Sequence, residues 1–315
     1  MEPELHPMTE NDPIETSEGL KNPKTAKKLR LQPTGALVIL WSLPLYARGP
    51  PSVRKFVEML DLSSGEDLFR RCNAICSWYD EVILNRKHFI KSLVESLLDE
   101  FGEGKGAQIV ILAAGKSPLA LELLVESSSR IAQIFEVDLA GIEEKKQLYS
   151  GLAPNIAPNI ALKLRCLTAD VTSDELLDQL VVEGFDPETP TIVLMEGISY
   201  YLQKKDLKGI ISKFGSGGRN QFIIEYLVPC SEVKSARRTI PKGIFSLIRK
   251  EAGTEGTICY TELELSRIFQ RSGGREISCT DMSEMERLRL GFNRRFCERR
   301  DGWIEGFLGE ILNRP

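Results

Sequence analysis

Two short segments of the sequence carry the residue types of a ligand site, and each directly follows an apolar run. The run Ile109–Leu112 leads into the small residues Ala113–Gly115 and then into a helical-looking segment, Leu119–Glu126. A second apolar run, Ile134–Val137, ends at Asp138. Small residues let backbone N–H groups approach a ligand closely, and an acid at a strand end accepts hydrogen bonds from ribose hydroxyls. The pattern predicts a nucleoside site; the alternative is an ordinary turn with a solvated aspartate.

The composition of the turn indicates which kind of nucleoside it binds. The dinucleotide pattern G-x-G-x-x-G, whose glycines bring the backbone against a pyrophosphate, is absent from this turn. We therefore expect a ligand that carries an adenosine without phosphates.

The residues that follow repeat the alternation of strand and helix. Two further predicted strands end near Asp170 and at Glu196. Strands that alternate with helices form a parallel sheet covered on both faces, and ligands bind at the carboxyl ends of its strands. We expect an α/β, Rossmann-like fold in which Gly115, Asp138, Asp170 and Glu196 meet at one edge. The predicted strands are 109–112, 134–137, 163–168, 191–195 and 221–226, and the helices between them are 119–126, 141–149, 173–182 and 204–214.

Segments without this alternation flank the predicted sheet. Residues 1–33 contain few large apolar side chains, which predicts a disordered tail. Residues 34–106 show helical spacing and form a predicted N-terminal helical cap on the ligand-binding core, 107–228. Residues 229–260 are a predicted insertion or lid, and residues 261–315 complete the fold. The helices expected in these parts are 34–43, 52–60, 65–84, 87–100, 233–250 and 261–270, followed by a strand over 276–280 and a helical stretch over 283–312.

Composition argues against several classes of protein. The 315 residues carry a formal net charge of −4, so no global basic surface is available to neutralise the phosphates of a nucleic acid. Seven cysteines without a C-x-x-C pair, beside two histidines, favour reduced thiols in a cytoplasmic protein and argue against a zinc site. No apolar stretch reaches the length of a membrane helix, and the polar start of the chain is unlike a signal peptide. We expect no metal, no nucleic-acid partner and no membrane.

Taken together, the motifs over about residues 80–285 resemble one family. The sequence resembles the leucine carboxyl methyltransferases, a branch of the class I S-adenosylmethionine-dependent methyltransferases. The resemblance implies a class I methyltransferase sheet and S-adenosylmethionine as the cofactor. The similar segments are Asn85–Phe89 before the first strand, Ile109–Gly115 (the glycine motif), Phe135–Asp138 (the ribose motif), Thr168–Val171 (the adenine motif), Phe185–Gly197 with Tyr200–Leu202, and Gly273–Met285.

The resemblance also implies roles for individual residues. Gly115 would lie against the methionine part of the cofactor, and Asp138 would bind its ribose. Arg86 or Lys91 would pair with the cofactor carboxylate. The full implied set of cofactor-binding residues is Arg86, Lys91, Ala113, Gly115, Asp138, Leu139, Asp170, Val171 and Glu196, with Asp170 and Val171 at adenine and Glu196 at the methionine end.

The sequence departs from the family pattern in three places. Ala113 stands where a glycine is usual, which is tolerable if its φ angle stays negative, and Lys116 follows Gly115. The last strand of the family has no visible counterpart, because 303–312 looks helical, so we expect a sheet that lacks an edge strand. The aromatic, proline-rich stretch 41–51 differs from the phosphatase-specific members, which favours a small-molecule substrate over a protein.

The expected activity is methyl transfer to a carboxylate or another oxygen or nitrogen acceptor. This reaction is an in-line displacement at a sulfonium, for which a protein supplies positioning and desolvation. Two alternatives stay open: cyclisation of S-adenosylmethionine to methylthioadenosine and a small cyclic amino acid such as azetidine-2-carboxylate, and a non-catalytic binding protein. The candidate catalytic residues are Tyr200, Tyr201 and Glu196, the candidate substrate-binding residues are Tyr46 and Arg48, and His88, Arg237 and Arg238 are weaker candidates that ordinary packing or solvation also explains.

Overall fold

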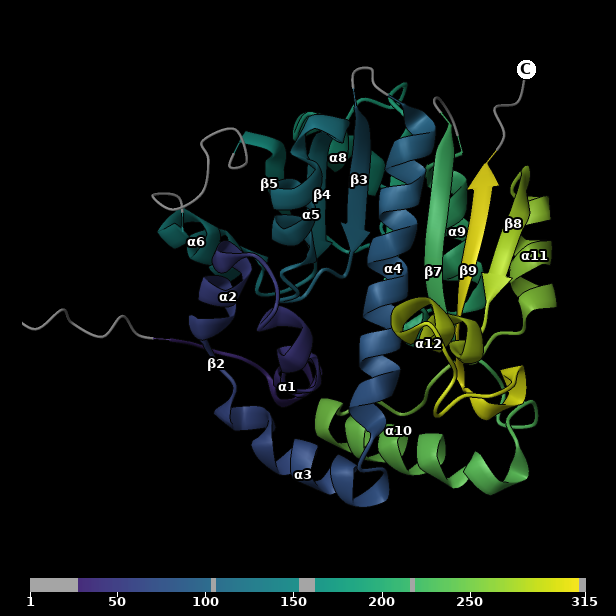
Figure 1. Cartoon of the computed structure of the whole chain (residues 1–315). Coiled ribbons are helices and arrows are strands. Elements are labelled where there is room, and N and C mark those ends of the chain that lie inside the picture. Colours follow the sequence, from purple (N-terminus) through teal and green to yellow (C-terminus); the bar gives the residue numbers. More distant parts are fainter. Residues whose placement is uncertain (1–27, 103–105, 153–161, 216–218, 312–315) are drawn as a thin grey trace, which may run out of the picture.

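The computed structural model describes residues 28–102, 106–152, 162–215 and 219–311. Its strands are β1 (Leu29–Arg30), β2 (Leu60–Asp61), β3 (Ala107–Leu112), β4 (Ile131–Asp138), β5 (Leu164–Thr168), β6 (Thr191–Met195), β7 (Asn220–Leu227), β8 (Gly274–Thr280) and β9 (Ile304–Ile311). A central seven-stranded sheet has the order β5-β4-β3-β6-β7-β9-β8 (Figure 1). Its strands run parallel, except that β9 is antiparallel to both β7 and β8. The predicted class I methyltransferase sheet is confirmed.

Helices cover both faces of the sheet and the edge at which its parallel strands end. They are α1 (Pro33–Tyr46), α2 (Pro51–Glu58), α3 (Glu66–Ile75), α4 (Tyr79–Phe101), α5 (Leu119–Ser127), α6 (Ile142–Leu152), α8 (Leu176–Val182), α9 (Lys204–Lys213), α10 (Thr239–Ala252), α11 (Glu262–Arg271) and α12 (Met282–Leu290). In Figure 1, α4 and α12 lie in front of the sheet, and α9 and α11 lie behind it. Helices α1, α3 and α10 lie below the carboxyl ends of β3 and its parallel neighbours. No helix in the described ranges is long and apolar enough to cross a membrane.

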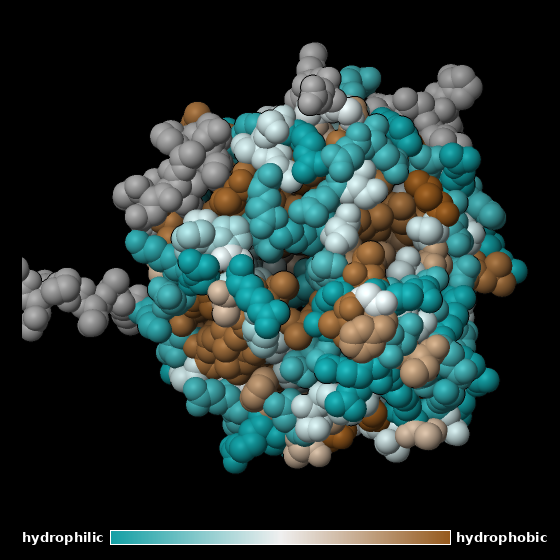
Figure 2. Space-filling view, viewed as in Figure 1, coloured by the Kyte–Doolittle hydropathy of each residue, from teal (hydrophilic) through white to brown (hydrophobic). Residues whose placement is uncertain are grey.

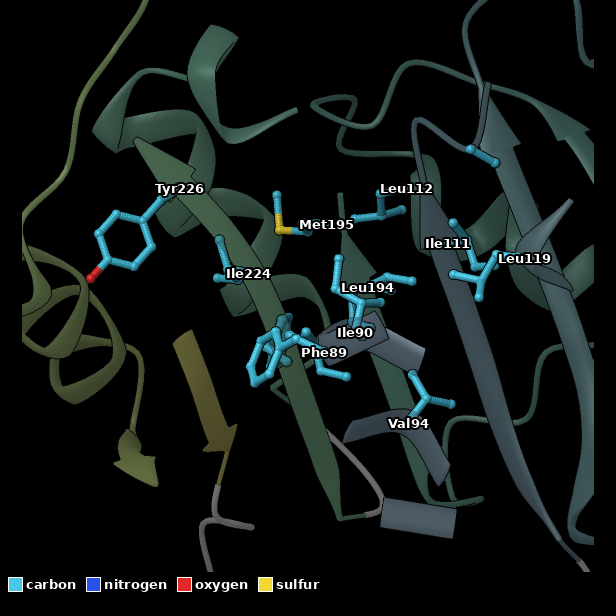
Figure 3. Close-up of a cluster of buried hydrophobic side chains, with 14 of the residues drawn as sticks. Phe89, Ile90, Val94, Ile111, Leu112, Leu119, Leu194, Met195, Ile224 and Tyr226 are labelled. Atoms are coloured by element: carbon cyan, nitrogen blue, oxygen red, sulfur yellow. The ribbon is translucent and has the colours of Figure 1, made fainter. Parts of the chain in front are cut away.

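The core forms where α4 packs on the central strands. Every residue of β3 and β6 is buried, because helices cover both faces of these strands. Figure 3 shows Phe89, Ile90 and Val94 of α4 directed at side chains of the sheet, among them Ile111 and Leu194. Complete burial of one such side chain stabilises the fold by about 1.5–3 kcal/mol. Helix α4 is therefore held rigidly, and it positions the polar residues of its first half at the edge of the sheet.

The C-terminal strand corrects one prediction. Residues Ile304–Ile311 form strand β9 between β7 and β8, so the expectations of a helix over 303–312 and of a missing edge strand were both wrong. All eight residues of β9 are buried. A strand covered on both faces shows no polar alternation, and a short apolar run cannot then be told from a helix by its pattern.

Several boundaries at the N-terminal side also differ from prediction. Leu29–Arg30 pairs in parallel with β2, so regular structure begins inside the predicted tail, whose residues 1–27 lie outside the described ranges. Helix α1 continues through Pro44 to Tyr46. The predicted helices 65–84 and 87–100 are instead α3 and the long α4, which begins at Tyr79.

The insertion and the C-terminal part contain less helix than their sequence suggests. Helix α10 begins at Thr239, six residues after the predicted start at Val233, and a short 3-10 turn, Ser235–Arg237, precedes it. In the predicted helical stretch 283–312, α12 ends at Leu290, where the left-handed Gly291 (φ 81°) terminates it. In these segments, charged residues without a clear apolar stripe form loops rather than the predicted helices.

Candidate functional site

One hydrogen bond ties the ends of β3 and β4 together. The backbone N–H of Gly115 donates to Oδ2 of Asp138 at 2.8 Å, and the N–H of Ala140 donates to Oδ1 at 3.2 Å. A carboxylate has about four acceptor positions, so Asp138 keeps lone pairs for a ligand. The turn Ala113–Gly115 and the carboxylate of Asp138 thus form one continuous surface at the sheet edge, which we call the cradle.

The turn between β3 and α5 is strained at Ala113. Its φ angle is +54°, and among the described residues it is the one residue other than glycine with a positive φ. The condition under which an alanine is tolerated here, a negative φ, is therefore not met. A left-handed alanine costs about 1–2 kcal/mol. Strain of this kind concentrates at binding sites, where the surrounding structure holds it.

A cavity of about 560 Å³ lies between this turn and the helices below the sheet edge. Its polar side contains Gly115, Asp138 and Glu196, from the ends of three neighbouring strands. Its volume falls in the usual range of about 300–1,000 Å³ for ligand sites. Apolar and aromatic side chains from α1, α4, α10 and the 3-10 turn Ser199–Tyr201 line much of the rest: Leu37, Val38, Ile39, Trp41, Tyr79, Ile83, Tyr200, Phe245 and Ile248. The cavity therefore combines polar groups at the strand ends with an apolar contribution from the helices that cover this edge.

A buried cluster of four charged side chains adjoins the cavity, and three of them, Arg86, Lys87 and Glu196, line it. Arg86 donates to Glu225 at 2.8 Å and to Glu196 at 3.2 Å, and Lys87 donates to Glu196 at 2.7 Å. Burial opposes ionisation of Glu196, but Lys87 and Arg86 lower the pKa of its carboxyl to about 2. Burial raises the pKa of Glu225 to about 7, against the effect of Arg86. Glu196 is consequently ionised at neutral pH and is a poor proton acceptor.

Two of the predicted tyrosines have buried hydroxyls without a hydrogen-bond partner among the described residues. The Tyr200 hydroxyl belongs to the cavity wall, and the Tyr46 hydroxyl lies in a smaller neighbouring pocket. Tyr201 also lines the cavity but is 43% exposed. Because a buried unpaired hydroxyl is costly, Tyr200 and Tyr46 are the groups that a polar ligand atom would satisfy.

The structure separates the two cations predicted for the cofactor carboxylate. Arg86 lines the cavity, whereas Lys91 lies in the neighbouring pocket and pairs with Glu122 (2.7 Å) and Glu126 (2.6 Å). Of the two, the geometry favours Arg86.

Other predicted residues lie at the periphery. Asp170 is exposed at the end of β5 and accepts two hydrogen bonds from Thr172, while Val171 is buried beside it. Leu139 is 68% exposed next to Asp138. These three lie outside the cavity wall, on the side of the sheet edge where adenine was expected.

The remaining substrate-binding candidates do not reach the cavity. Arg48 is exposed and lies outside the cavity wall. Arg237 and Arg238 donate to backbone carbonyls of Arg295 and Val233. His88 lies in the neighbouring pocket, where burial, Arg289 and Lys91 lower its pKa.

Sequence reasoning missed Lys87 and Glu225. A signal existed for Glu225, since it is a single acid inside the apolar run of β7, where a buried carboxylate requires a cationic partner. Trp41 lies in the predicted helical cap and Phe245 in the predicted insertion or lid, and both line the cavity. The sequence did not single out Phe245 itself, because an apolar side chain on a helix is as compatible with core packing as with a cavity wall.

The strand order and the cradle at Asp138 define the class I S-adenosylmethionine-dependent methyltransferase fold. Residues 73–215 match the family model of leucine carboxyl methyltransferase. This stretch contains β3–β6 and the whole glycine turn, and over it the chain is similar to the leucine carboxyl methyltransferase family. The family predicted from the motifs, and S-adenosylmethionine as the cofactor of that family, are thereby confirmed.

Solved structures are similar in fold. A candidate methyltransferase from Thermobifida fusca YX has a TM-score of 0.58 and 14% identity, over 91% of this chain and 96% of that protein. A DUF574 family protein from Streptomyces avermitilis MA-4680 has a TM-score of 0.58 and 12% identity, over 79% of this chain and 91% of that protein. Identities this low establish the shared fold alone. Comparison with curated proteins finds no match.

Proposed function

We propose that this protein transfers the methyl group of S-adenosylmethionine to a small-molecule acceptor. The observation that carries the proposal is the two-sided cavity. Its polar part is built from the glycine turn and Asp138, and its apolar part is built from α1, α4 and α10 and from the 3-10 turn that carries the unpartnered Tyr200 hydroxyl. A cofactor bound in the polar part of the cavity leaves the apolar part free for a methyl acceptor.

The residues at the strand ends fit the cofactor. Asp138 would hold the ribose hydroxyls with its free lone pairs, and Arg86 would face the carboxylate. Gly115 offers the necessary space, because a Cβ atom placed there would meet nothing within 4 Å. Asp170 and Val171 would face adenine. When bound, the cofactor supplies an electrophilic methyl group on a sulfonium.

The chain's own residues position the acceptor and exclude water. The apolar side chains of α1 and α10 desolvate the nucleophile, which raises its reactivity toward a methyl group. The Tyr200 hydroxyl would donate a hydrogen bond to a polar atom of the acceptor and so orient it. Tyr201 stands at the rim of the same wall.

The chemistry of the cavity wall favours a carboxylate acceptor. No histidine lines the described cavity, and Glu196 is held ionised by Lys87 and Arg86. A carboxylate is already deprotonated at neutral pH, so its methylation requires no general base, whereas a protonated amine or an alcohol would need one.

Product analysis tests the proposal. The purified protein is incubated with S-adenosylmethionine alone and then with a pool of small carboxylic acids. The proposal predicts S-adenosylhomocysteine only when an acceptor is present. Methylthioadenosine formed without any acceptor would instead identify the cyclising activity. Cofactor binding without either product across the pool would favour a non-catalytic binding protein.

A further inference from the structure

A second pocket opens between α4, α5 and the end of α1. Its volume is about 290 Å³, at the small end of the usual ligand pockets. It shares Lys87, Ser117, Leu119 and Glu196 with the larger cavity, so the two spaces adjoin at this wall. Figure 2 shows a hollow near the centre of this face, in the region where Figure 1 places α1, α4 and α5.

The wall of this pocket carries an excess of negative charge. Glu122 and Glu126 share the single cation Lys91. Glu95, which lies half-buried on α4, has no ion-pair partner among the described residues. His88 is neutral at pH 7 because burial, Arg289 and Lys91 lower its pKa. Glu196 is already balanced by Lys87 and Arg86. The other three carboxylates of the wall (Glu95, Glu122, Glu126) face the single ammonium group of Lys91, which leaves two negative charges.

Two buried hydroxyl groups without hydrogen-bond partners are a second, independent indication that this pocket binds a ligand. Tyr46 is 3% exposed, lines the pocket, and has a hydroxyl with no hydrogen-bond partner. The Ser117 hydroxyl, at the wall shared with the cavity, is likewise buried and unpartnered. Both oxygens can accept a hydrogen bond, and an ammonium group has three N–H donors and no acceptor. The Lys87 ammonium group already lies over the Tyr46 ring, 6.0 Å from its centroid, so Tyr46 offers a ligand its hydroxyl rather than its ring face.

We propose that this pocket binds the cationic arm of the methyl acceptor. The acceptor is then a small molecule with an apolar body in the main cavity and a primary or secondary amine that extends between α4 and α5. Glu95 pairs with the ammonium group, and Tyr46 accepts one of its hydrogen bonds. The inference rests on the proposed function in one respect, namely that the ligand is the acceptor rather than an effector.

Titration of the full-length, S-adenosylmethionine-saturated protein with 1,5-diaminopentane tests the site. Calorimetry should detect binding of this diamine and none of pentanoate, which has a similar chain and the opposite charge. Glu95→Gln removes one charge-assisted pair without changing shape, so the diamine should bind about tenfold more weakly. Tyr46→Phe should weaken binding about fivefold, as expected for one lost hydrogen bond. Glu100→Gln, at an exposed acid of the same helix outside the pocket, removes the same charge and should leave affinity unchanged.

Three results would overturn the inference: no binding of the diamine, equal weakening by Glu95→Gln and Glu100→Gln, or competition between the diamine and S-adenosylmethionine. Competition would assign the pocket to the cofactor's own amino group. Failure of S-adenosylmethionine itself to bind would contradict only the proposed function, because the diamine titration of the cofactor-free protein still tests the pocket.

Discussion

The backbone N–H of Gly115 donates a 2.8 Å hydrogen bond to Oδ2 of Asp138, a residue 23 positions further along the chain. The bond joins the turn after β3 to the end of β4. It fixes the Asp138 carboxylate relative to the glycine turn, and a fixed carboxylate loses less conformational freedom when it binds a ligand. The same turn contains Ala113, whose positive φ angle of 54° strains the backbone.

Replacing Ala113 by glycine should stabilise the protein. Glycine adopts φ +54° without strain, and the relief outweighs the added entropy of the unfolded chain, for a net gain of about 0.5–1 kcal/mol. Chemical denaturation measures the change. The neighbouring Ala114→Gly has no positive φ to relieve and should destabilise the fold. If both variants lose stability equally, the turn is not strained as described.

Removing the Tyr200 hydroxyl should separate turnover from stability. This hydroxyl is buried without a partner, so Tyr200→Phe should leave the free energy of unfolding unchanged or raise it by up to about 1 kcal/mol. Turnover with the cognate acceptor should fall, while affinity for S-adenosylmethionine holds.

Tyr260→Phe is the matched control for that substitution. The Tyr260 hydroxyl donates to the carbonyl of Leu202, so its loss should destabilise the fold by about 1–3 kcal/mol. Arg48→Ala should leave turnover intact, because Arg48 lies outside the cavity wall. A Tyr200→Phe enzyme of full activity would exclude that hydroxyl from acceptor binding.

The stability of the protein should depend on pH through Glu225. Its pKa in the fold is about 7, above the ordinary value of 4.5, mainly because it is buried. A native state with the raised pKa binds the proton more tightly than the unfolded chain, so this group's stabilising contribution is complete below pH 4.5. It is lost as pH rises through about 7, a change of about 3 kcal/mol.

Glu225→Gln should abolish that dependence. We expect the unfolding free energy of the variant, relative to wild type, to rise between pH 4.5 and about 7 and to level off at higher pH. Denaturant titrations at several pH values give the difference, in which the contributions of groups that do not interact with Glu225 cancel. Parallel curves for the two proteins would mean that Glu225 titrates normally in the fold. Glu100→Gln, at an exposed acid, should run parallel to wild type.

The sequence predicted the part of the site that depends on local pattern. Asp138 and Gly115 could be found because an apolar run, a small-residue turn and a terminal acid are all read within a few positions. Contacts between segments that are distant in the sequence could not be predicted in this way. Lys87 meets Glu196 across 109 positions, and Arg86 meets Glu225 across 139, so neither pair leaves a local signal.

The misread strand β9 has a different physical cause. Its eight residues are buried on both faces, which removes the alternation that distinguishes a half-exposed strand. Its glycines make room for neighbouring rings: a Cβ atom on Gly306 would lie 2.3 Å from Cε1 of Phe89, and one on Gly309 would lie 2.5 Å from Cε1 of Phe269. Those contacts exist only in the assembled sheet.

Gly306→Ala therefore tests the placement of β9 against α4. The added methyl group must displace the Phe89 ring, and overpacking of this kind costs about 1–3 kcal/mol. The thermal midpoint should fall accordingly. Gly209→Ala provides the comparison, because it meets nothing within 4 Å inside α9 and should stabilise the helix by about 0.5–1 kcal/mol. A tolerated Gly306→Ala would contradict the observed packing of β9.

The most direct test of the account is the affinity of S-adenosylmethionine for wild type and for Asp138→Ala, measured by calorimetric titration. Two hydrogen bonds from ribose hydroxyls to a charged acceptor are lost in the variant, so binding should weaken by about 2–4 kcal/mol. Asp138→Asn keeps one oxygen for the Gly115 N–H and should show a smaller loss. Unchanged affinity in Asp138→Ala, with the fold intact by circular dichroism, would contradict the assignment of this cavity to the cofactor.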